Sequence, residues 1–124
     1  MAQIKSYDTL SDVKDHIKRG RILSKGETLT IATGAATATD SYHLLAGQDG
    51  NADDLATLNY AVTAQAGQIV VLQAAADVTI TVKNGDGNIA CGADFDLDNV
   101  DDAITLMWTG AKWVSIAQVS NGAD

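Results

Sequence analysis

Three aspartates spaced by two residues, Asp94, Asp96 and Asp98, have a pattern that could bind a cation. In a β-strand their carboxylates would project from one face, and carboxylate oxygens are the ligands that Ca²⁺ prefers. The EF-hand template does not fit, because its glycine and glutamate positions hold Asn99 and Thr105. Solvated carboxylates on the outer face of a strand explain the spacing equally well. Both interpretations stay open, and we assign no metal and no cofactor.

The sequence lacks the residue sets that acid/base catalysis and nucleophilic catalysis usually need. The adjacent carboxylates at 53–54 and 101–102 are typical of turns, and paired acid/base carboxylates need a cleft that nothing in the sequence indicates. Cys91 is the only cysteine, and the pattern brings neither His16 nor His43 to it. We expect Cys91 to be a small buried apolar residue and the protein not to be an enzyme.

Aromatic residues offer a different kind of site. Trp108 and Trp113 flank Gly110 and can pair across a hairpin. They form either an exposed aromatic surface, suited to sugars, or ordinary core packing. Tyr42 and His43 alternate across a strand, so one of them points inward, and we expect Tyr42 to pack against the strand's neighbours.

The charged side chains divide the 124 residues into two parts. Residues 1–27 hold six basic and four acidic side chains, whereas residues 28–124 hold two lysines and twelve aspartates. The net charge of −8 therefore combines a mildly basic leader with a strongly acidic body. An acidic body repels phosphate backbones, and no segment approaches the ~20 apolar residues of a membrane span. We expect neither a nucleic-acid partner nor a membrane partner.

Residues 6–20 have the apolar spacing of one short amphipathic helix, with Gly20 as a natural stop. A helix of about three turns is marginal alone, so we expect it to dock on a partner. The start of the chain lacks the apolar run of a secretory signal, which predicts synthesis in the cytoplasm. The predicted docking arm, residues 1–27, uses an apolar face and a basic set: Leu10, Val13, Lys14, Ile17, Lys18, Arg19, Arg21, Ile22 and Leu23.

Beyond Gly26 every regular segment has the pattern of a β-strand. The continuous apolar run at 68–73 is typical of a strand covered on both faces, and the glycine at 110 marks a hairpin. Residues 51–60 fit one helical turn or an irregular loop. We predict an all-β domain over residues 28–124, a β-sandwich or jelly roll of about eight short strands near 28–33, 41–46, 68–73, 77–83, 89–91, 95–97, 103–109 and 112–118.

Six segments carry a further resemblance: 41–43, 53–58, 67–72, 79–89, 94–99, and 102–106 leading to 110–113. Together they resemble a small β-structured module found in virion proteins of tailed bacteriophages, the head decoration and fibre proteins. The resemblance covers about seven-tenths of the chain. It implies a homotrimeric or otherwise oligomeric virion protein without catalysis.

The basic leader before an acidic body favours one role within that group. We expect a capsid decoration, or cement, protein on the capsid surface of the virion, whose arm binds the assembled major capsid protein. Such a protein stabilises the shell because it binds only the assembled form. The alternative is a receptor-binding or glycan-binding tip of a tail or head fibre that uses Trp108 and Trp113. A metal-dependent enzyme is the third class, and the sequence shows no ligand set with an open position for it.

Overall fold

A computed structural model of the chain describes residues 23–122, and all regular structure in that range is β. The all-β prediction is confirmed, whereas the predicted helix and the arm residues before Leu23 lie outside the described residues. No helix of the described range is long and apolar enough to cross a membrane. The eleven strands are β1 (Leu29–Thr30), β2 (Ala35–Ala38), β3 (Tyr42–Ala46), β4 (Ala52–Leu55), β5 (Thr57–Tyr60), β6 (Ile69–Ala74), β7 (Thr79–Val82), β8 (Ile89–Ala90), β9 (Phe95–Leu97), β10 (Ala103–Trp108) and β11 (Trp113–Val119).

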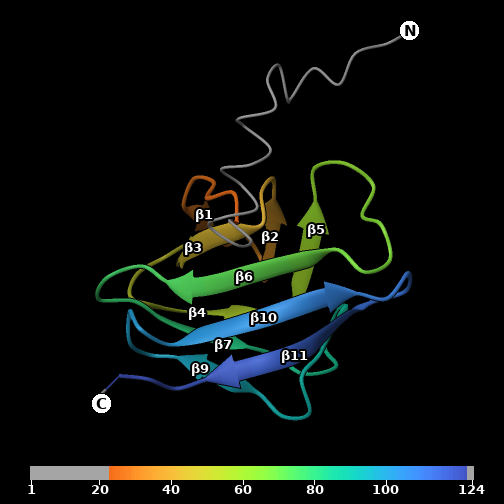
Figure 1. Cartoon of the computed structure of the whole chain (residues 1–124). Helices are drawn as coiled ribbons and strands as arrows, with labels where there is room; N and C mark the ends of the chain where they lie inside the picture. The colour runs from red at the N-terminus through yellow and green to blue at the C-terminus, as the bar shows by residue number, and fades with distance from the viewer. Residues whose placement is uncertain (1–22, 123–124) are drawn as a thin grey trace, which may run out of the picture.

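Two successive turns of the chain lie side by side as coils of a short β-solenoid (Figure 1). The first coil contains β2, β3 and β4, and the second contains β5, β6 and β7. Each strand of the second coil pairs in parallel with its counterpart in the first. The predicted jelly roll or sandwich is therefore wrong, because those folds are built from antiparallel strands. Alternation predicts strands, but it carries no information about their direction.

After β7 the chain reverses and closes the stack. β9 runs antiparallel to β7, and β10 runs antiparallel to β6. A hairpin then joins β10 to β11, with Trp108 opposite Trp113, as the glycine at 110 predicts. The result is a six-stranded sheet in the order β1-β3-β6-β10-β11-β8, a three-stranded sheet β4-β7-β9 and a two-stranded sheet β2-β5.

Inward side chains of neighbouring strands fill the space that these sheets enclose. Leu72 of β6 lies between His43 of β3 and Ile104 of β10, and all three are fully buried. Burial of each large aliphatic side chain contributes about 1.5–3 kcal/mol to stability. The buried apolar core consists of Ile31, Ala36, Ala38, Leu45, Leu55, Leu58, Val70, Leu72, Ala74, Ile80, Val82, Ile89, Cys91, Leu97, Ile104, Leu106 and Trp113.

One side-chain amide substitutes for a strand that the solenoid lacks. Beyond β5 the two-stranded sheet has no further strand in the described residues, and Asn88 lies there instead. Its Oδ1 accepts from the backbone N–H of Leu58 at 2.9 Å, and its Nδ2 donates to the carbonyl of Leu58 at 2.8 Å. The amide thereby satisfies both backbone groups of a buried residue.

His43 fastens the start of the described chain to the first coil. Its Nδ1–H donates to the carbonyl of Glu27 at 2.7 Å, and its Nε2 accepts from the backbone N–H groups of Thr39 and Asp40, each at 3.0 Å. These partners fix the neutral tautomer with its proton on Nδ1. Gly26 lies against the ring, and a Cβ at that position would collide with His43. The inward residue of the Tyr42–His43 pair is thus the histidine.

Asp102 fastens the end of the described chain, after β11, to the body. Its side chain is fully buried, and it accepts from the backbone N–H groups of Asn121, Gly122 and Asp98 at 2.8, 3.1 and 3.2 Å. Burial by itself raises the pKa of Asp102, but these hydrogen bonds, with one from the Asp98 side chain, outweigh burial and hold the pKa below 3.8.

We predict that His43→Leu lowers the free energy of unfolding by about 3 kcal/mol, because two partly buried backbone N–H groups and one carbonyl lose their hydrogen bonds to the imidazole. Urea unfolding followed by circular dichroism measures the effect. Tyr42→Phe is the matched control, since it removes only a hydroxyl bonded to Gln73 at the surface of the same strand. A His43→Leu protein as stable as the wild type would contradict the assigned role.

We predict that Asp102→Asn lowers the free energy of unfolding at neutral pH by about 1–3 kcal/mol, since an amide cannot accept from all three N–H groups. The folded-state pKa is depressed, so the carboxylate's contribution is present above its unfolded value of 3.8 and is lost as the pH falls through the folded pKa. The wild type and the variant should therefore converge in acid. Urea unfolding across a pH series tests this, with Asp101→Asn, at an exposed neighbour, as the control. A difference that persists unchanged in strong acid would refute it.

Candidate functional site

An aromatic hollow of about 190 Å³ lies between the end of β5 and the β10–β11 hairpin. Tyr60, Trp108 and Trp113 supply its aromatic rings. The ring centroids of Trp108 and Trp113 are 5.3 Å apart, and those of Tyr60 and Trp113 are 6.5 Å apart. Strand pairing makes this cluster, because it places Trp108 directly opposite Trp113 and brings β5 alongside through Asn88.

Trp113 is the floor of the hollow rather than an exposed recognition residue. Only 1% of its surface is accessible, and its Nε1–H donates to the carbonyl of Leu58 at 3.0 Å. Of the two alternatives that the sequence left open, an exposed aromatic surface or core packing, Trp113 therefore has the second, because it belongs to the core. Trp108 is partly buried against it and, with Tyr60, supplies the accessible aromatic surface.

Polar groups lie at the rim of the same hollow. Asn59 of β5 and Thr63 of the following loop are exposed and line it, next to Val62, which is 68% exposed. An aromatic surface flanked by an amide and a hydroxyl suits a ligand with apolar faces and hydroxyl edges, such as a sugar ring. Sequence reasoning missed these rim residues and Tyr60, because residues 51–60 have no clear strand pattern.

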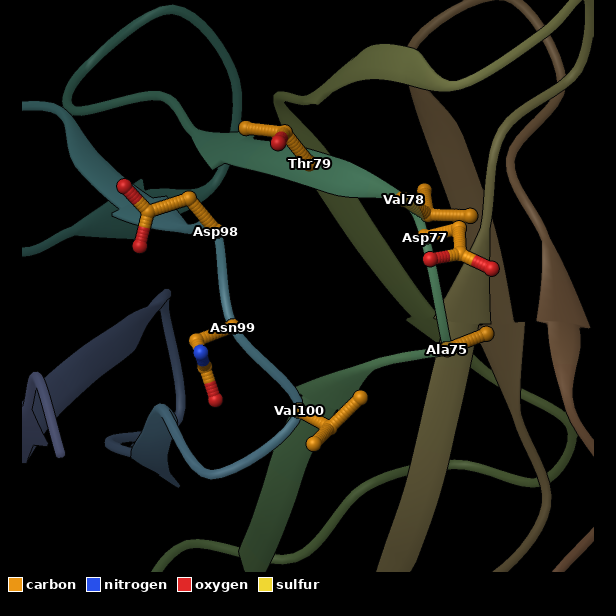
Figure 2. Close-up of a pocket in the computed structure, with 7 residues that line it drawn as sticks. All are labelled: Ala75, Asp77, Val78, Thr79, Asp98, Asn99 and Val100. Atoms are coloured by element: carbon orange, nitrogen blue, oxygen red, sulfur yellow. The ribbon is translucent and has the colours of Figure 1, made fainter. Parts of the chain in front are cut away.

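A larger hollow of about 400 Å³ lies between residues 75–79 and residues 98–100. Figure 2 shows the carboxylates of Asp77 and Asp98 on opposite walls, turned away from one another. Asn99 also points away from Asp77 (Figure 2). These side chains do not converge on a common point, so the arrangement does not form an acid/base pair.

The aspartates considered as calcium ligands have partners within the fold. Asp94 accepts from the ammonium of Lys83 and from the backbone N–H of Asn84, both at 2.8 Å. The Asn84 hydrogen bond, and then that of Lys83, lower the pKa of Asp94. Asp96 accepts from the hydroxyl of Thr81 at 2.7 Å. Within residues 23–122 no three acidic, histidine or cysteine side chains are grouped to hold a metal ion.

Cys91 has the role that the sequence predicts. It is 8% exposed, and its thiol donates to the carbonyl of Ala93 at 3.2 Å. Burial, and then the charge of Asp94, raise the pKa of the thiol, which disfavours the reactive thiolate. Cys91 is a core residue.

Most of the residues predicted for the docking arm lie outside the described residues. Of the nine predicted arm residues only Leu23 is described, and it is 37% exposed. Comparison with known protein families and with curated proteins finds no match to this chain.

Proposed function

We propose that the protein is a structural component of a tailed-phage virion, a capsid decoration protein at the capsid surface. Its leader binds the assembled major capsid protein, and its β body is displayed, as a homo-oligomer. The resemblance of residues 28–115 to head decoration and fibre modules supports this role. The charge division between leader and body supports it as well.

The observation that carries the proposal is how the leader joins the body. The N–H of Gly26 donates to the carbonyl of Tyr42 at 2.8 Å, and the N–H of Tyr42 donates to the carbonyl of Ser24 at 3.0 Å. Ser24 also bonds to Ser41 and Asp40, and Lys25 lies over the Tyr42 ring at 5.6 Å. Residues 24–27, which the sequence groups with the leader, are therefore bonded to the body. The leader departs from a fixed point beside β3, as a docking arm requires.

The position of the attachment point in the sheet also fits an arm. In the six-stranded sheet, β3 lies near one edge, beside β1, and β11 lies toward the other. Capsid contacts at the leader would thus leave the β10–β11 hairpin and the aromatic hollow away from the attachment point. The basic residues of the leader, Lys14, Lys18, Arg19 and Arg21, would pair with acidic groups of the shell.

Cosedimentation with emptied virion shells tests the proposal. We expect the wild type to bind and the variant Val13→Asp/Ile17→Asp to lose binding, because two charges disrupt the apolar face of the arm. A protein that lacks residues 1–22 should also lose shell binding. It keeps residues 24–27, which are bonded to the body beside β3. Val100→Asp, at a body position that is 49% exposed, is the matched control. Undiminished shell binding by both arm variants would overturn the docking role.

The aromatic hollow favours a second candidate, a receptor-binding or glycan-binding tip of a fibre. Trp108→Ala should then weaken binding to host cells or their polysaccharide about tenfold or more, because a stacking surface is lost. Trp108→Phe should restore part of it, while Ile116→Ala, which alters an exposed residue outside the hollow, should have no effect. Isolated protein that binds neither cells nor polysaccharide would eliminate this candidate.

A further inference from the structure

The outer face of the six-stranded sheet is largely apolar and carries no charge. Because His43, Leu72 and Ile104 point inward, the alternate residues of the same strands point outward. We call this surface the outer apolar face, and none of its strands holds an Asp, Glu, Lys or Arg. Two neighbouring rows of partly exposed residues define it: Tyr42, Val71 and Thr105, and Ile69, Met107 and Val114.

The sequence of β6 is typical of a strand that is covered on both sides. Its run Ile-Val-Val-Leu-Gln-Ala is nearly continuous in apolar residues. Among residues 23–122 only the inner side of β6 is buried, whereas Ile69 and Val71 on the outer side remain partly exposed. A cover that completes the pattern has to come from outside the described residues, either from the leader or from another molecule.

The described chain begins at the border of the outer apolar face. Lys25 forms a parallel bridge with Tyr42, through the backbone hydrogen bonds that Gly26 and Ser24 make with that residue. The Lys25 ammonium lies over the Tyr42 ring, 5.6 Å from its centroid, so the chain already covers one end of the face. Residues 1–22 join the chain just before this contact. The tether makes contact between leader and face intramolecular, which favours it over the same contact between two copies.

The leader is long enough to lie on this face, and the face is large enough for one helix. Four adjacent strands spaced by ~4.8 Å, each with about five residues of ~3.3 Å, make a face of about 300 Å². The helix predicted over residues 6–20 would be about 22 Å long and about 10 Å wide, which is a footprint of roughly 220 Å². The six residues from Ile17 to Leu23 span up to about 20 Å when extended, more than the ~14 Å that separate β3 from β11.

Charge also favours the leader as the cover. Residues 1–22 hold five basic and three acidic side chains, whereas residues 23–122 hold three basic and twelve acidic ones. Asp77 and Asp101, both exposed, follow β6 and precede β10, so carboxylates lie at the ends of the central strands. Opposite charge therefore draws the leader to its own body, whereas a second copy brings a further charge of −8 and is repelled.

We propose that the leader docks on the outer apolar face of its own chain, with the predicted helix lying on the sheet. The stripe of Leu10, Val13 and Ile17 packs on the rows of Val71 and Met107, as an amphipathic helix packs on a sheet. A helix of about three turns is marginal alone, so the sheet is what keeps it folded. The docking does not rest on the capsid role. Where both hold, shell and face compete for one stripe, and the arm stays shielded until the shell binds it.

Hydrogen–deuterium exchange of the full-length protein, followed by mass spectrometry, tests the docking. In the wild type the amides of residues 10–19 should exchange at least about tenfold more slowly than in an unfolded chain. Val71→Lys, at the centre of the face, should remove this protection, because it places an unpaired charge under the helix. Thr81→Lys, at the outward centre of the three-stranded sheet, is the matched control and should leave the protection unchanged. Met107→Lys is a second variant in case Val71→Lys fails to fold, as judged by circular dichroism.

Three results would overturn the inference. One is a wild type whose leader exchanges as fast as an unfolded chain. Another is protection that persists in folded Val71→Lys and Met107→Lys proteins. The third is protection that falls as the wild type is diluted, which would show that the leader of another copy covers the face.

Cosedimentation with shells separates this failure from that of the proposed function. Val71→Lys leaves the arm residues intact and should still bind shells, whereas Val13→Asp/Ile17→Asp should lose both shell binding and protection. A wild type whose leader is unprotected but which still cosediments with shells keeps the capsid role and loses only the docking on its own body.

Discussion

In-register parallel pairing between the two coils is the constraint on which the rest of the structure depends. It places each inward residue of one coil beside a fixed residue of the next, so neighbouring side chains must be complementary in size. Ala36 lies beside Leu58, Ala38 beside Tyr60, and Leu45 beside Ala74. In these three pairs a large side chain lies opposite a small one, which helps to fill the narrow interior. A shift by one residue would turn every inward side chain outward, so the pairing is strongly specified.

Buried polar groups hold the segments that strand pairing leaves unattached. His43 fastens residues 26–27 and the corner before β3, and Asp102 fastens the chain after β11. Asn88 supplies the hydrogen-bond acceptor and donor for Leu58 of β5 that a further strand would otherwise supply. The described residues contain no buried side-chain nitrogen or oxygen without a partner. These three side chains therefore define where the solenoid begins, where it ends and how its shortest sheet is completed.

Local pattern predicts the strands of this fold better than it predicts their arrangement. All eight expected strands form, including the short ones at β8 and β9. The missed strands, β2, β4 and β5, are rich in Ala, Asp and Asn, which favour strands weakly, and pairing with the neighbouring coil makes them strands. The alternation of apolar and polar residues does not show whether two strands pair in parallel or antiparallel. Likewise, Asp101 and Asp102 look alike in sequence, yet only Asp102 is buried, because three backbone N–H groups converge on it.

The placement of charge connects the fold to assembly. A solenoid has several flat faces, each of which could pack against another molecule, and an association that used all of them would not close. In this chain the three-stranded sheet carries outward aspartates, and the six-stranded sheet carries no charge at all. The outward aspartates of the three-stranded sheet therefore oppose unspecific association through that face, because like charges on two acidic bodies repel one another.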